Sequence, residues 1–92
     1  PQSLLIAEVI LEVEGGVVGI AWLDKEHQLA SDEQVVAAKF ATQRVTVSVG
    51  SNQAHRLMLR NVAVDQRKAV FTLRNLSTST AAGAALSVDP LG

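Results

Sequence analysis

The strongest constraint on the fold lies in residues 4–14, LLIAEVILEVE, where polarity alternates along the segment. Apolar side chains recur at every second position: Leu5, Ala7, Val9, Leu11 and Val13. Glu8 and Glu12 occupy positions between them, and Glu14 follows Val13. Because the side chains of a strand point alternately to opposite faces, this pattern predicts a strand with one buried face and one solvated face.

A glycine pair separates this predicted strand from a second extended run. Gly15–Gly16 is followed by VVGIAWL at 17–23, and two extended runs around two glycines are typical of a tight hairpin with positive φ at the turn. Trp22 lies on the returning strand, where we expect it to anchor the core. Its indole N–H then needs a hydrogen-bond acceptor inside the domain.

Residues 32–43 fit two structures. Ser31 and Gln34 have the spacing of a helix capping box, and the residues after them favour a helix. As a strand, the same segment places Val36 and Phe40 on one side. We favour the strand because the run is short, has no glycine at its end and continues into the next strand without a break. A short helix at about 32–43 is the alternative.

The rest of the chain supplies four more apolar runs, most of them bounded by turn signals. They are RVTVSVG at 44–50, HRLMLRNVAV at 55–64, AVFTLRNL at 69–76 and AALSV at 84–88. Short strands separated by turn signals indicate an all-β fold. We therefore predict one domain, residues 1–92, folded as a single seven-stranded antiparallel β-sandwich of immunoglobulin-like type. The alternative is an α+β fold that contains the short helix.

Composition excludes several classes of protein. Apolar residues form 48% of the 92 residues, which argues against a disordered chain. Thirteen alanines and only three aromatic residues predict a core of small side chains, which favours packing against a neighbour. The absence of cysteine excludes disulfides and thiolate metal sites. No run approaches the roughly 18 apolar residues of a membrane span, so we expect no membrane insertion.

Charge is divided unevenly along the chain. The net charge of −1 gives no case for binding nucleic acid. Residues 1–46 hold seven acidic and three basic side chains, whereas residues 47–92 hold two acidic and five basic ones. In one interpretation the two halves interleave in space and their charges cancel. In the other, the molecule has unlike ends, which suits head-to-tail contact between copies.

The tripeptide Leu-Arg-Asn occurs at 59–61 and again at 73–75. The flanks do not match, so this is no internal repeat. With residues 65–68 as a turn, the two segments become arms of one hairpin that places Arg60 opposite Leu73. One hairpin face then mixes apolar and polar side chains, and exposed apolar patches mark contact sites. We predict that face as the interaction surface: Leu57, Leu59, Asn61, Val70, Thr72, Arg74 and Leu76. A β-bulge or a covering segment would explain the same pattern without a partner.

Few residues carry the patterns of catalysis or metal binding. His27 and His55 are the only histidines, and neither has a spacing partner typical of metal ligands. No serine lies in a nucleophile motif. An amine at Pro1 would resemble the base of tautomerase-type enzymes, but the β-α-β scaffold of those enzymes is not evident here. We therefore expect no catalytic residue, no metal site and no cofactor.

These patterns favour a non-enzymatic module for protein interaction or structural assembly, which associates through a sheet face or edge with a protein partner or with itself. The alternative is a small carbohydrate- or ligand-binding β-sandwich, in which Trp22 would be exposed to stack on the ligand. An enzyme that uses Pro1 or the His27 loop is a third interpretation. We expect a secreted, cell-surface or particle-associated location rather than a cytoplasmic one.

Overall fold

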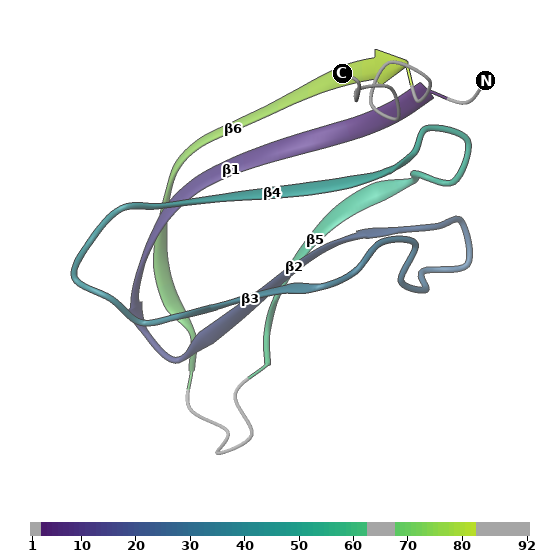
Figure 1. Ribbon diagram of the computed structural model, residues 1–92. Coiled ribbons are helices and arrows are strands. Elements are labelled where there is room, and N and C mark those ends of the chain that lie inside the picture. The colour runs from purple at the N-terminus through teal and green to yellow at the C-terminus, as the bar shows by residue number, and fades with distance from the viewer. Residues whose placement is uncertain (1–2, 63–67, 83–92) are drawn as a thin grey trace.

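The computed structural model describes residues 3–62 and 68–82 and shows an all-β fold (Figure 1). These residues form six strands: β1 (Ser3–Gly15), β2 (Val17–Leu23), β3 (Gln34–Ala37), β4 (Gln43–Gly50), β5 (Arg56–Asn61) and β6 (Val70–Ala82). No helix forms in this part of the chain. Two three-stranded antiparallel sheets pack against each other, so the prediction of an all-β sandwich is confirmed. The seventh strand predicted at 84–88 lies outside the described residues.

Each sheet has an apolar strand at its centre. The first sheet has the order β4-β1-β6 and the second sheet the order β3-β2-β5. Figure 1 shows β6, β1 and β4 in one layer and β5, β2 and β3 in the other. The chain crosses between the layers after β1, β3, β4 and β5. Among consecutive strands, only β2 and β3 are neighbours in one sheet.

β1 provides the largest share of the core, and its apolar side chains lie opposite those of β4. Leu5 lies opposite Val49 and Ala7 opposite Val47, so these side chains share the inner face of the first sheet. The buried core consists of small and branched side chains with one tryptophan: Ala7, Val9, Leu11, Val13, Val18, Ile20, Trp22, Val36, Val47 and Val49. The strand predicted at 4–14 and its buried face are therefore confirmed.

Trp22 on β2 links the two sheets. Its side chain is only 6% exposed, and its indole N–H donates a hydrogen bond to the backbone carbonyl of Val47 on β4 over 3.1 Å. The buried indole thus has the acceptor that it needs, which confirms the predicted core anchor. The same burial removes the exposed ring that the ligand-binding alternative required.

The glycine pair forms a corner between the sheets instead of closing a hairpin. β1 pairs with β4 and β6, whereas β2 pairs with β3 and β5, so the hairpin predicted at Gly15–Gly16 is wrong. The reason is that both strands carry an apolar face, and packing them face to face buries both. The predicted positive φ is confirmed at Gly16, where φ is 76°.

The strand interpretation of residues 32–43 is confirmed, although the strand is short. Gln34–Ala37 forms the edge strand β3, and Val36 is buried in the core. Phe40 was predicted on the same side as Val36, but it lies in the connection to β4 and is fully exposed. The backbone N–H of Lys39 donates to the Val13 carbonyl over 3.0 Å, which holds this connection against the end of β1.

The hairpin predicted between residues 57 and 76 is also wrong, since β5 and β6 lie in different sheets. Arg60 lies opposite Gly19 of β2, and Leu73 lies opposite Leu11 of β1. β6 and β1 each contain 13 residues. Pairing along this length forms more backbone hydrogen bonds than a short local hairpin would, which explains why β6 pairs with β1 and not with β5. Residues 65–67 of the predicted turn lie outside the described residues.

Candidate interaction surface

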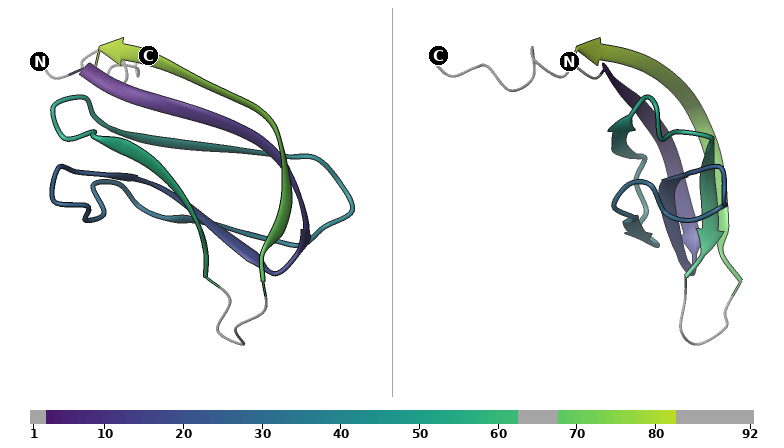
Figure 2. Two further views of the ribbon diagram at one scale, coloured as in Figure 1. Left: turned by 180° about the vertical axis from the view of Figure 1, so that it is seen from behind. Right: turned by 90° about the vertical axis from the view of Figure 1, so that its right-hand side faces the viewer.

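β6 is an edge strand that is paired on one side. In the part of the chain that the structure describes, it pairs with β1 alone. The register shifts between Leu73 and Asn75, so Arg74 forms a bulge. The right-hand view of Figure 2 shows β6 running along the margin of the molecule. A strand in this position presents backbone N–H and C=O groups to which another chain can bind.

Three large apolar side chains of β6 are exposed on the inner side of the first sheet. Phe71, Leu73 and Leu76 lie opposite core residues of β1 that are fully buried. The three side chains nevertheless remain 38%, 47% and 44% exposed. The second sheet therefore covers β1 but does not cover β6 to the same extent. We call Phe71, Leu73 and Leu76 the β6 strip.

The structure divides the predicted interaction surface between two sheets. On β5, Leu57 and Leu59 lie opposite Trp22 and Ile20 and pack half-buried against the core. Asn61 is exposed at the end of β5. The β5 part of the predicted surface thus belongs mainly to the inner side of the second sheet, away from the β6 residues with which it was grouped.

The β6 part of the predicted surface lies on both faces of the first sheet. Thr72 and Arg74 contact glutamates on the outer face, and Val70 at the start of the strand is 52% exposed. Leu76 lies on the inner face, because the bulge shifts the alternation by one residue. The predicted surface did not include Phe71 and Leu73, so the sequence did not indicate their exposure.

Polar contacts occupy the outer face of the first sheet. Arg74 Nη2 lies 2.9 Å from the Glu12 carboxylate, and the Thr72 hydroxyl donates to the neighbouring Glu14 over 3.4 Å. The Glu12–Arg74 pair joins the acidic half of the chain to the basic half, as the pair of Glu33 with Arg60 also does. These contacts support the interpretation in which the two halves interleave.

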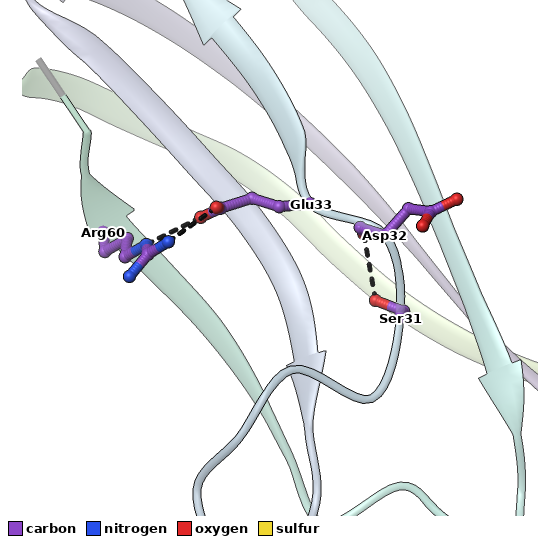
Figure 3. Close-up of polar contacts among 4 residues, drawn as sticks. All are labelled: Ser31, Asp32, Glu33 and Arg60. Atoms are coloured by element: carbon purple, nitrogen blue, oxygen red, sulfur yellow. Dashed lines mark hydrogen bonds and ion pairs between the residues drawn. The ribbon is translucent and has the colours of Figure 1, made fainter.

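The pair of Glu33 with Arg60 covers the outer face of β2 (Figure 3). The Arg60 Nε and Nη2 atoms each donate to the Glu33 carboxylate over 2.7 Å. These hydrogen bonds hold the pKa of Glu33 below its ordinary range and raise the pKa of Arg60. Gly19 lies beneath the pair, and a Cβ there would clash with the Glu33 carboxylate. The missing side chain therefore leaves room for the ion pair across β2.

Other polar groups among the described residues mainly shape loops. The rings of His27 and His55 lie 6.2 Å apart between centroids. Asp24 accepts two backbone N–H groups of its own loop, which fixes the turn after β2. Within residues 3–62 and 68–82, no group of three or more His, Cys, Asp or Glu side chains could hold a metal ion. Pro1 lies outside the described residues.

No family model matches the chain, and no curated protein and no solved structure shows significant similarity to it. In the described residues no helix has the length and apolar character that a membrane crossing requires. A functional assignment therefore depends on the surface of the molecule itself, and on β6 above all.

Proposed function

We propose that this chain is a non-enzymatic protein-interaction module, an immunoglobulin-like sandwich that binds a protein chain along β6. The observation that supports the proposal is the position of the β6 strip on an edge strand. Apolar side chains and backbone hydrogen bonds are the two contributions by which a sheet edge binds an extended segment of a partner. β6 offers both along one strand.

The neighbouring groups favour an uncharged partner segment. Arg74 is the only charged side chain of β6, and Glu12 of the adjacent strand neutralises it. This strand therefore carries no net charge that would attract an acidic or basic partner in a salt-dependent way. An extended, uncharged segment fits the strip best.

The strip also carries a risk that a partner would remove. Long edge strands with exposed apolar side chains promote nonspecific association, and most proteins shorten, charge or cover them. β6 has 13 residues, and the three apolar side chains of the β6 strip lie within six positions of one another. Binding of a partner along β6 would cover both the strip and the edge that the described residues leave open.

Replacement of Leu73 by lysine tests the proposal. Leu73 is half-exposed at the centre of the strip, so the charged head of the new side chain stays in water and the fold is retained. Val35→Lys is the matched control, because Val35 is 62% exposed on the edge strand of the other sheet. Circular dichroism and denaturant unfolding establish that both variants are folded.

Association is measured by sedimentation velocity over a concentration range and by retention of partner proteins on the immobilised chain. We expect association of the wild type and of Val35→Lys, and its loss in Leu73→Lys. A wild-type chain that is strictly monomeric and retains no partner contradicts the proposal. Equal association of all three proteins moves the interaction away from β6 and contradicts it as well.

A further inference from the structure

We propose that the partner on β6 is a second copy of this chain, paired with it antiparallel through β6 about a two-fold axis at Ser77. This inference rests on the proposed function and names the partner. It joins the two first sheets into one continuous sheet of six strands, in the order β4-β1-β6 followed by β6-β1-β4 of the second copy.

Among the described residues, length and lack of protection distinguish β6 from the other edge strands. β3, β4 and β5 have four, eight and six residues, whereas β6 has 13. Edges are commonly protected from pairing by short length, by proline or by a charged side chain, lysine above all. β6 contains no proline and no lysine, and its one charge is held by Glu12.

The second half of β6 is compatible with a copy of itself. In a two-fold pairing, residues near the axis face their own counterparts, so a charged residue there meets a like charge. The segment after Arg74 is NLSTSTAA, which contains no charge. The edges of β4 and β5 instead carry arginines: Arg44, Arg56 and Arg60. β3 carries no charge but has only four residues, so self-pairing is least opposed at β6.

The faces of the strand allow this register. With Ser77 opposite Ser77 of the second copy, Leu76 lies opposite Thr78 and Leu73 opposite Thr80, with the bulge at Arg74 passed over. All four of these residues face the inner side, as their partners on β1 show. Antiparallel partners must share a face, and this register satisfies that condition.

This register also accounts for the strip. It uses β6 from Phe71 to Ala82, whereas moving the axis to Thr78 leaves Phe71 without a partner. Leu73 and Leu76 each gain the methyl group of a threonine as a neighbour, and β-branched side chains pack well against apolar side chains on a pleated surface. The strips of the two copies then lie on one face of the joined sheet, on either side of the axis.

A single cysteine introduced at the axis tests both the partner and the register, because the chain has no cysteine of its own. In Ser77→Cys the two thiols of the pair face each other, within the Cα separation of about 4.4–6.8 Å that a disulfide needs. In Ser79→Cys, on the same face, the two thiols are four residues out of register, about 13 Å apart. Ser48→Cys, exposed on β4, measures random collision.

Cross-linking is followed on non-reducing gels after addition of oxidised glutathione. We expect Ser77→Cys to form its disulfide-linked dimer about a hundredfold faster than the other two variants. Paired thiols react at an effective concentration near millimolar, whereas unpaired thiols meet at the protein concentration, set at about 10 µM. Wild-type protein is expected to sediment as a dimer, Thr78→Lys as a folded monomer, and Thr46→Lys on β4 as a dimer. Equal cross-linking of all three cysteine variants overturns the inference.

The outcomes separate this inference from the proposed function. A monomeric wild type whose capture of a different protein is lost in Leu73→Lys overturns the second copy and leaves the proposed function standing. A monomeric wild type with no capture overturns both. A dimer that persists in Thr78→Lys and in Leu73→Lys places self-association on another surface and overturns the pairing through β6.

Discussion

Replacement of Gly16 by alanine should destabilise the domain strongly, although the neighbouring glycine should accept the same change. Gly16 has a φ of 76°, in the left-handed region, which costs an alanine about 1–2 kcal/mol. Its Cβ would also lie 2.7 Å from the carbonyl oxygen of Lys68 and 2.9 Å from the Cα of Ala69. Both are backbone atoms of the two residues that precede β6, so they cannot move aside as a side chain can. Relieving such overpacking costs about 1–3 kcal/mol.

The expected total is a loss of about 3 kcal/mol in the free energy of unfolding, which lowers the Tm by roughly 12–24 °C in a domain of this size. Thermal and denaturant unfolding followed by circular dichroism measure it. Gly15→Ala is the control, because a Cβ at Gly15 has no heavy atom within 4 Å. We expect that variant to stay within about 1 kcal/mol of the wild type. Equal unfolding free energies for the two variants would refute the corner described at Gly16.

Two further predictions concern buried and paired polar groups. Trp22→Phe should lower the free energy of unfolding by about 2 kcal/mol, because it removes the hydrogen bond to the Val47 carbonyl and leaves a small void. Urea unfolding measures this loss, and an unchanged unfolding midpoint would contradict it. The lowered pKa of Glu33 means that its stabilisation is present above the ordinary carboxyl pKa and is lost as the pH falls through the lowered value. Arg60→Gln should flatten the acid side of the profile of unfolding free energy against pH, whereas Arg56→Gln, which removes the same charge from an exposed position on the same strand, should leave that slope unchanged.

Features that depend on neighbouring residues along the chain could be predicted from the sequence. The alternation in residues 4–14 identified the inner face of β1, because a half-buried strand requires that period whatever its partners are. The burial of Trp22 followed from its place on the strand after the glycines, and the positive φ at Gly16 followed from the glycine pair. Each of these is set by local backbone geometry or by one strong apolar side chain.

Pairing between strands could not be predicted in the same way. Gly15–Gly16 and residues 65–68 both have the composition of hairpin turns, yet each connects strands that lie in different sheets. A glycine corner and a glycine hairpin need the same φ, so the sequence does not distinguish them. The choice depends on which faces must be buried against each other, and this is a property of the whole sandwich.

The exposure of β6 shows the same limit at the candidate surface. β4 and β6 are both edge strands beside β1, and both carry apolar side chains on the inner face. Val47 and Val49 of β4 are buried, whereas the β6 strip is not. Twisted sheets that cross at an angle overlap fully at their centres and incompletely at their edges. Two strands with similar apolar patterns can therefore be covered by the opposite sheet to different extents. The inner side chains Phe71, Leu73 and Leu76 of β6 are apolar like those of a core strand, so this face is suited to packing once a second strand pairs with the edge that the described residues leave open.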